Sequence, residues 1–208
     1  MVCQSALAHQ PIIVESEITE IKKPDVSQAF YGNLQGRADI YKLRLDEQQT
    51  IYFSLLVPDL EGIATDVSLQ ITKDGKEVRV LSGEGFNWKK FYEEFAGDHY
   101  LQGPEEKITL EKGEYSLEVS SPSNRGKYVL VIGEKEEFPL SEIINTIKTL
   151  PRLKRDFFEK SAWGAFFNRI GLFVFGPVII FVLIMASLIA LIYIKKKKKK
   201  MKMPTKPE

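Results

Sequence analysis

His99 is the residue of this 208-residue chain whose type and surroundings most readily suggest chemistry. Asp98, Glu105 and Glu106 lie close to it in sequence, and Ser82 offers a hydroxyl in the preceding segment. A histidine oriented by a carboxylate can act as a general base on a serine, so this set permits a hydrolase. The sequence has no Gly-x-Ser-x-Gly elbow, and nothing in it brings these groups within hydrogen-bond reach. A hydrolase that uses His99 is therefore the alternative hypothesis.

The sequence lacks the residue spacings that are typical of metal sites. There is no HExxH, no CxxC and no DxDxDG loop, so we predict no cofactor. Asp59, Glu61 and Asp66 could offer oxygen atoms to Ca²⁺, although a solvated turn is the default interpretation.

The stretch around His99 is better interpreted as a binding site than as a catalytic site. Residues 98–106 combine a histidine, a tyrosine, an amide and acids, and they follow a segment rich in aromatic residues. Loops on a rigid scaffold commonly carry specificity, so we predict a surface for a protein or glycan. The candidate binding residues are His99, Tyr100, Gln102, Glu105 and Glu106.

The aromatic residues that precede His99 also have a purely structural interpretation. Trp88, Phe91, Tyr92 and Phe95 are spaced i, i+3, i+4, i+7, which is one face of a two-turn helix. Asn87 stands at the N-cap position of this helix, and Gly97 stands where a left-handed residue would end it. The spacing predicts a short inserted helix over residues 88–95 that covers an edge or end of a sheet.

Residues 170–194, IGLFVFGPVIIFVLIMASLIALIYI, form a run of 25 residues without a charge. At about 1.5 Å per residue, this run is longer than the ~30 Å hydrocarbon core of a bilayer. A buried helix of this length would normally show a polar stripe, and this one shows none. The run predicts a single transmembrane helix.

Charge is distributed unevenly along the chain. The tail, residues 195–208, holds eight lysines against one glutamate, whereas the whole chain has a net charge of only +1. Lysines that follow a membrane span mark its cytoplasmic side, so we predict the tail inside and the N-terminal domain outside the plasma membrane. The tail can also bind anionic lipid. The remaining, acidic part of the chain disfavours nucleic acid as a partner.

The N-terminal residues suggest export. Ala6-Leu7-Ala8 fits the cleavage pattern of a secretory signal, although the expected apolar stretch does not precede it. We expect residues 1–8 to be the remnant of a signal peptide and the true start codon to lie upstream; an accidental match is the alternative. Cleavage after Ala8 would remove Cys3, the only cysteine, and would leave a mature domain without a thiol.

Residues 28–133 alternate apolar and polar side chains as half-buried strands do. Asp74-Gly75 predicts a type I′ hairpin, and residues 111–114 and 123–126 predict further turns. Val129 and Val131 make one strand apolar on both faces, and residues 50–57 form a nearly continuous apolar strand. Seven or eight short strands predict a mainly β fold, namely an antiparallel, jelly-roll-like β-sandwich over residues 9–138.

Several strand and turn segments carry a family resemblance. They are Tyr31-Gly32, Asp39-Ile40-Tyr41, residues 110–115 and residues 126–130. In these segments the chain resembles the bacterial pre-peptidase C-terminal domain over about half its length. The resemblance implies an extracytoplasmic, non-catalytic accessory domain, although no peptidase is attached here and residues 82–106 are an insertion. The layout, with His9-Gln10-Pro11 at the start of the mature part, also resembles bacterial membrane-anchored envelope proteins.

Residues 139–169 connect the predicted sandwich to the predicted membrane helix. Ser141 can cap an amphipathic helix that Pro151 would end. Beyond it, Phe157, Phe158 and Trp163 are mixed with basic residues, which predicts a collar at the membrane surface; packing on the sandwich is the alternative. The whole chain is therefore interpreted as a single-pass, membrane-anchored binding or accessory domain. A hydrolase and an accessory subunit of a membrane complex are the alternatives.

Overall fold

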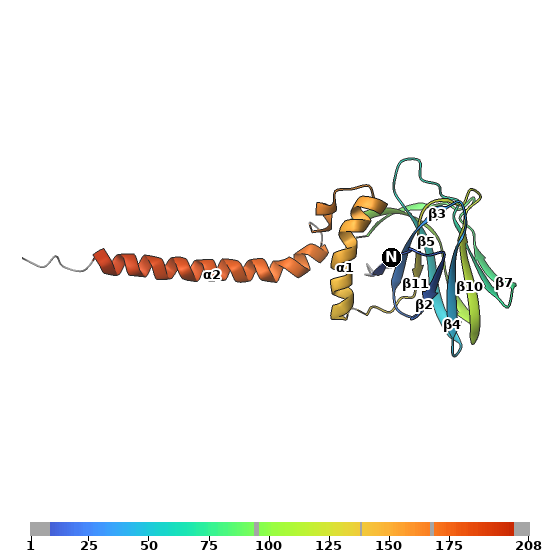
Figure 1. Ribbon diagram of the computed structural model, residues 1–208, viewed down its shortest axis with the longest axis horizontal. Coiled ribbons are helices and arrows are strands. Elements are labelled where there is room, and N and C mark those ends of the chain that lie inside the picture. The colour runs from blue at the N-terminus through green and yellow to red at the C-terminus, as the bar shows by residue number, and fades with distance from the viewer. Residues whose placement is uncertain (1–8, 94–95, 138, 167–168, 202–208) are drawn as a thin grey trace, which may run out of the picture.

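The computed structural model describes residues 9–93, 96–137, 139–166 and 169–201, and two facing sheets make up most of it (Figure 1). The order of strands in the six-stranded sheet is β1 (Gln10–Ile13), β3 (Gln28–Gln35), β11 (Arg125–Ile132), β5 (Gln49–Pro58), β9 (Asp98–Leu110) and β8 (Lys89–Glu93). The order in the five-stranded sheet is β2 (Ile18–Ile21), β4 (Asp39–Leu45), β10 (Gly113–Ser120), β6 (Ser68–Lys73) and β7 (Lys76–Leu81). The predicted β-sandwich is confirmed.

The sheets are mixed rather than wholly antiparallel, and the described residues form eleven strands instead of seven or eight. The parallel pairs are β1 with β3 and β2 with β4, while the remaining neighbours run antiparallel. Both additional N-terminal strands have four residues and lie at sheet edges. Segments this short show too few alternations to be recognised from the sequence.

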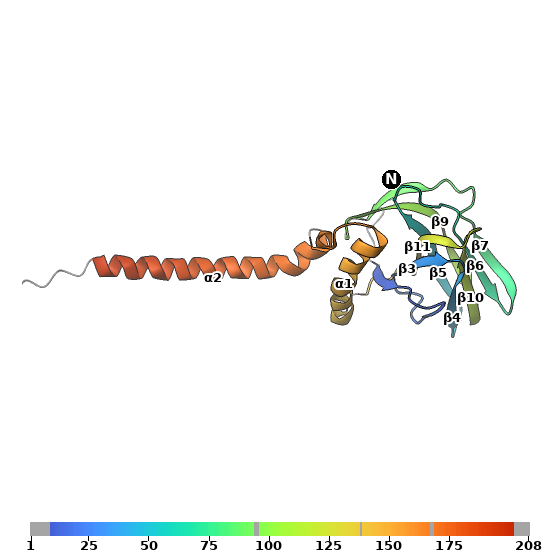
Figure 2. The same ribbon diagram turned by 45° about the horizontal axis from the view of Figure 1, so that its top comes forward.

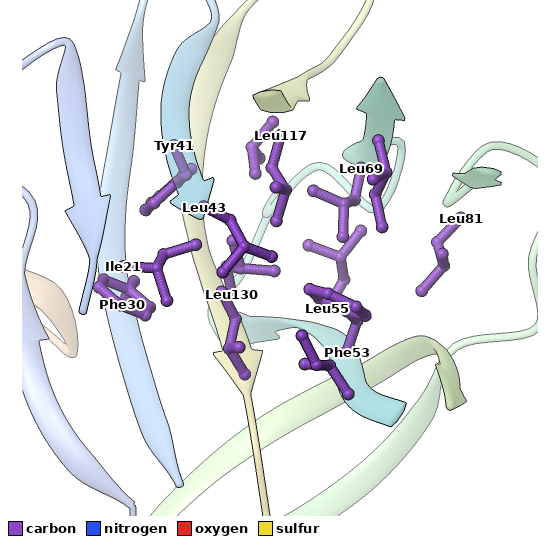
Figure 3. Close-up of a cluster of buried hydrophobic side chains, with 14 of the residues drawn as sticks. Ile21, Phe30, Tyr41, Leu43, Phe53, Leu55, Leu69, Leu81, Leu117 and Leu130 are labelled. Atoms are coloured by element: carbon purple, nitrogen blue, oxygen red, sulfur yellow. The ribbon is translucent and has the colours of Figure 1, made fainter. Parts of the chain in front are cut away.

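The main hydrophobic core lies between the two sheets (Figure 3). Alternate residues of each strand point into it, as period-two alternation requires. Leu43 and Leu117 enter from the five-stranded sheet, whereas Phe53 and Leu130 enter from the six-stranded sheet, and all four are buried. At about 25 cal/mol per Å² of apolar surface removed from water, this interlayer contact is the main source of the sandwich's stability.

Tyr41 and Tyr128 place two hydroxyl groups inside this core. The hydroxyls are 2.8 Å apart, and that of Tyr128 also donates to the carboxylate of Asp39 at 2.7 Å. Burial raises the pKa of Tyr128 above its ordinary value, so its hydroxyl stays protonated as a donor. Gly32 lies against the Tyr128 ring, and a Cβ at that position would come within 2.3 Å of it. Gly32 and Tyr128 both belong to the segments that carry the family resemblance, and both contribute to close packing in the core.

The predicted turns are confirmed where their residues favour a positive φ. Asp74 and Gly75 both have positive φ, at 51° and 73°, as the type I′ turn between β6 and β7 requires. Asn124, between β10 and β11, also has positive φ. Asparagine, aspartate and glycine tolerate this region of the backbone map, which is why these turns could be read from the sequence.

Residues 139–169, here called the connector, contain a helix α1 (Leu140–Arg152), a π-helical turn (Leu153–Phe157) and a 3₁₀ turn (Ala162–Ala165). Ser141 is not the cap: the helix begins at Leu140 after Pro139, and no side chain caps it. Pro151 does not end the helix either, because the chain continues helically into the π-helical turn.

The connector packs on the outer face of the six-stranded sheet and forms a second hydrophobic core there. Phe157 contacts Tyr31 edge to face at 5.1 Å, and Phe158 contacts Tyr100 in the same way at 5.3 Å. The predicted membrane collar is therefore wrong for Phe157 and Phe158, which are buried. Their burial explains why β11 is apolar on both faces: Val129 and Val131 face the connector, and the alternate residues face the sandwich core.

Helix α2 (Arg169–Met201) extends away from the sandwich (Figure 1). Within the described residues it supplies one segment, Phe175–Lys195, that is long and apolar enough to cross a membrane. None of this segment is buried against the rest of the chain. Its 21 residues correspond to about 31 Å of helix, which matches the ~30 Å hydrocarbon core.

Candidate functional site

The stretch that contains His99 forms a β-hairpin, so the predicted helix over residues 88–95 is wrong. Residues Lys89–Glu93 are β8, which pairs antiparallel with β9 along Lys89–Gln102 and Phe91–Tyr100. Asn87 therefore caps no helix, whereas Gly97 has the expected positive φ of 71° in the hairpin turn. Phe95 lies outside the described residues. Aromatic residues favour strands, and the backbone of β9 offers β8 a complete ladder of hydrogen bonds.

Trp88 stands at the entrance to β8 and is structural. Its indole nitrogen donates to the carbonyl of Gly83 at 3.0 Å, and its ring packs against the main core. A Cβ added at Gly103 would lie 2.5 Å from the ring, and one added at Gly83 would lie 2.9 Å from it. The ring therefore fits between two glycines, and it fixes the start of the hairpin.

Asp98, the first residue of β9, joins the hairpin to the connector. One carboxylate oxygen accepts from Lys154 at 2.7 Å, and the other accepts from Lys160 at 3.1 Å. Lys154 also donates to the carbonyl of Ala96 at 2.6 Å. The side chains of Lys154 and Asp98 are only 3% and 1% exposed, so this ion pair is buried. A buried charge needs such partners, and the hairpin turn is held in place as a result.

His99 is exposed and packs against Tyr92, with ring centroids 4.7 Å apart and ring planes inclined by 39°. Tyr92 lies on β8, and 51% of it is exposed. The backbone nitrogen of Asp59 donates to the carbonyl of His99 at 3.0 Å, and the Asp59 carboxylate pairs with Lys90 at 3.1 Å. These four residues, Asp59, Lys90, Tyr92 and His99, are called the edge surface below, because β8 is the outermost strand of its sheet.

Tyr100 points to the opposite side of the strand and is 3% exposed. Its hydroxyl lies 2.9 Å from that of Tyr31, beneath Phe158. Burial raises the pKa of Tyr100 well above its ordinary value, so this hydroxyl stays protonated. Tyr100 is thus part of the second core and presents no ring to a ligand.

Gln102 and Glu105 interact with each other on the outer face of the sheet. The amide of Gln102 donates to the Glu105 carboxylate at 2.7 Å, and the hydroxyl of Tyr52 donates to the same carboxylate oxygen. Burial, together with this hydrogen bond, raises the pKa of Tyr52. Glu106 points the other way and pairs with Arg79 of β7 at 2.7 Å.

The five predicted binding residues therefore do not share one surface. Residues 98–106 are not a loop but the first part of β9, and successive residues of a strand point to opposite sides. His99 belongs to the edge surface, Tyr100 is buried, Gln102 and Glu105 lie on the outer face, and Glu106 bonds to the other sheet. Their binding role stays a prediction, which we now confine to the exposed members.

The acids that could orient His99 interact elsewhere. Asp98 accepts from two lysines, Glu105 from Tyr52 and Gln102, and Glu106 from Arg79. Among the described residues no hydrogen bond joins the ring of His99 to an acid or to Ser82. Among the described residues, His99 thus forms no Ser–His–acid triad with Ser82 or with the nearby acids.

The acids that could bind Ca²⁺ do not form a metal-binding group in the described part of the chain. Within the described part of the chain, no three His, Cys, Asp or Glu side chains are grouped so that they could hold a metal ion. Asp59, Glu61 and Asp66 therefore do not converge on a calcium site, and Asp59 is engaged by Lys90.

Tyr92, Lys154 and Lys160 are the important neighbours of the site that sequence reasoning missed. The sequence carried one usable signal for the connector: a strand that is apolar on both faces needs a second layer. The Phe157-Phe158 pair was the natural candidate for that layer. The partners of Asp98 had no such signal, because they lie more than fifty residues away in sequence.

Comparison with solved structures finds matches of low sequence identity and low TM-score. The pre-peptidase C-terminal domain of a collagenase from Bacillus anthracis is 17% identical, with a TM-score of 0.35, over 54% of this chain and 91% of that one. A periplasmic inhibitor of g-type lysozyme from Salmonella Typhimurium is 20% identical, with a TM-score of 0.31, over 62% of this chain and all of that one. These likenesses concern the fold alone. No protein-family model and no curated protein matches the sequence.

Proposed function

We propose that this chain is a single-pass, membrane-anchored extracytoplasmic domain that binds a protein partner through the edge surface, without catalysis. The observation that supports this proposal is the exposed ring contact between Tyr92 and His99 at the open edge of the six-stranded sheet. Tyrosine is enriched at protein interfaces because its ring offers a large contact area at a small entropic cost. A glycan, which also stacks on aromatic rings, is the alternative ligand.

The strand that bears Tyr92 suits a protein partner. In the described residues no strand pairs with the outer edge of β8, so its backbone can accept an added strand. The exposed side chains of Lys89 and Lys90 would keep such an edge from uncontrolled pairing and favour an acidic partner segment. The buried Asp98–Lys154 pair fixes the hairpin, so little ordering is needed when a partner binds.

The binding test uses the intact chain in membranes. Tyr92→Ala combined with His99→Ala removes both exposed rings, and Ile18→Ala removes an exposed apolar side chain from the edge strand β2 of the other sheet as a matched control. We expect pull-down to recover a partner with the parent chain and the control, and to lose it with the double variant. Recovery of the same partner by the double variant would move the interface elsewhere. Release of the partner by added oligosaccharide would indicate a glycan.

Membrane topology is the second part of the proposal. Residues 195–200 are six lysines that follow the apolar segment, which supports a cytoplasmic tail and an outside sandwich. Each lysine near an anionic leaflet adds roughly 1 kcal/mol of attraction, so the tail also holds anionic lipid. Protease added to cells with a permeabilised outer envelope should digest the sandwich and spare the tail. Protection of the sandwich would reverse this topology.

An accessory subunit of a membrane complex is the second candidate. It is favoured by the apolar segment of α2, none of which is buried within this chain, so its side chains face lipid or another membrane helix. Replacing that segment with a polyleucine span of equal length keeps the anchor and removes its specific surface. Loss of the partner in this variant, with Tyr92→Ala and His99→Ala having no effect, would establish this candidate. Hydrolysis that is abolished by His99→Ala would instead revive the enzyme hypothesis.

A further inference from the structure

The apolar face of helix α1 is only partly covered by the rest of the chain. Leu150 is buried beside Ala96, and Ile147 is half-buried. Leu140 and Ile144 lie on the same helical face as Ile147, at i, i+4 and i+7, yet both are exposed, Leu140 to 73%. Lys148, four residues after Ile144, is exposed as well. The first turns of the helix therefore present apolar side chains, with a lysine close by, to the surroundings of the protein.

Trp163, in the 3₁₀ turn that follows the helix, is a further exposed apolar side chain, with 70% of it exposed. Its ring lies 6.2 Å from that of Phe166, which in turn lies 5.8 Å from that of Phe175. Phe175 is the first residue of the segment that can cross a membrane. A continuous series of aromatic rings therefore runs from the exposed tryptophan to the start of the span.

The arrangement of the two helices fits a membrane surface. In both views α1 lies between the sandwich and α2 and runs across the direction of α2 (Figures 1 and 2). If α2 crosses the bilayer, α1 therefore lies along its surface. Helix α2 begins six residues before Phe175, which is about 9 Å of helix and comparable to the ~5–7 Å depth of one headgroup layer.

We propose that the connector is seated on the outer leaflet, with Leu140, Ile144, Lys148 and Trp163 in contact with lipid at the boundary of headgroups and acyl chains. The inference rests on the proposed membrane anchorage of α2. Tryptophan prefers this depth because its ring is apolar and its N–H is polar, and lysine suits the phosphate level. Leu153, Phe157 and Phe158 of the connector are buried in the second core, so the sandwich is held against the bilayer instead of hanging from a flexible tether.

The two tryptophans of the chain allow a direct test. The full chain is reconstituted into phosphatidylcholine–phosphatidylglycerol vesicles that contain lipids brominated near the start of the acyl chain, which quench tryptophan on contact. Trp163→Phe serves as the reference, because this side chain is exposed and its loss leaves the fold intact. The difference between the parent and Trp163→Phe gives the emission of Trp163, and the emission that remains is that of Trp88.

We expect brominated lipid to quench most of the Trp163 emission and to leave Trp88 unchanged, since Trp88 packs on the sandwich core. Quenching of Trp163 by acrylamide in water, with no effect of bromine, would overturn the proposal. Protection from both quenchers would also overturn it and would assign the surface to a protein contact. Resistance of the chain to alkaline extraction reports insertion of α2 separately. Loss of that resistance would refute the proposed anchorage, whereas its retention without lipid quenching would refute only the seated connector.

Discussion

Lys154→Met removes one charge of the buried pair that holds the connector to the β8–β9 hairpin. Methionine keeps much of the apolar stem of lysine, so the change tests the charge more than the packing. Asp98 would keep Lys160 as a partner at 3.1 Å, but Lys160 is 43% exposed and replaces the lost hydrogen bond only in part. Breaking a buried pair by removing one member costs about 3–5 kcal/mol, and Lys160 places this variant near the lower end.

Asp98→Asn leaves the opposite charge without compensation. Lys154 would remain 3% exposed, with the Ala96 carbonyl at 2.6 Å as a neutral acceptor. We therefore expect a loss of about 4 kcal/mol in the free energy of unfolding. The double variant Lys154→Met with Asp98→Asn removes both buried charges and both desolvation penalties. It should be destabilised by about 2–3 kcal/mol less than the sum of the single changes.

Urea unfolding of the full chain in detergent measures these differences. With a slope of about 2 kcal/mol per M, a loss of 3 kcal/mol lowers the midpoint by about 1.5 M. Because the pair joins the connector to the sandwich, amide hydrogen exchange should accelerate first in the π-helical turn Leu153–Phe157 and in the hairpin. Single variants within about 0.5 kcal/mol of the parent, or strictly additive effects, would show that the pair does not hold the connector.

Three other outcomes are expected. Trp88→Ala should lower stability by about 3 kcal/mol, because the ring fills the space between two glycines; an unchanged melting curve with lost binding would instead indicate an exposed platform. Gly32→Ala should cost about 3 kcal/mol in chemical unfolding, since its Cβ meets the fully buried ring of Tyr128, and a stable variant would contradict this packing. Burial lowers the pKa of His9 to about 4, so the neutral ring is favoured in the fold, and the stability this gives above pH 6.5 is lost as the pH falls towards 4. Because His9 is only partly buried, we expect this loss of stability to be about 1–2 kcal/mol. His9→Gln should remove this part of the pH dependence of unfolding, and an identical pH profile in the variant would refute the prediction.

The stretch around His99 is a hairpin of two strands, where the sequence predicted a short helix followed by a loop. The i, i+3, i+4, i+7 spacing of Trp88, Phe91, Tyr92 and Phe95 is a valid helical pattern, yet the segment from Lys89 to Glu93 is a strand. Helical spacing records only which side chains can share a helical face. The first five residues of β9, which pair with the whole length of β8, decided the outcome in this short segment.

The connector shows a similar limit. Aromatic and basic residues before a membrane span predict an interfacial collar, and Trp163 is exposed as such a collar requires. Phe157 and Phe158 have the same composition around them and are buried against the sheet. Composition gives the same signal for a lipid surface and for a protein surface, because both remove aromatic rings from water.

The sequence by itself determined the period-two strands, the Asp74-Gly75 turn and the apolar segment within α2, because each depends on local backbone preference or on the hydropathy of one continuous segment. The tertiary structure alone decided that Asp98 meets Lys154, that Tyr100 is buried while His99 is exposed, and that the connector forms a second core. These contacts join residues far apart in the chain, and the side on which a strand residue lies depends on the pairing register. Register and long-range contacts are set when the layers pack, which no local pattern encodes.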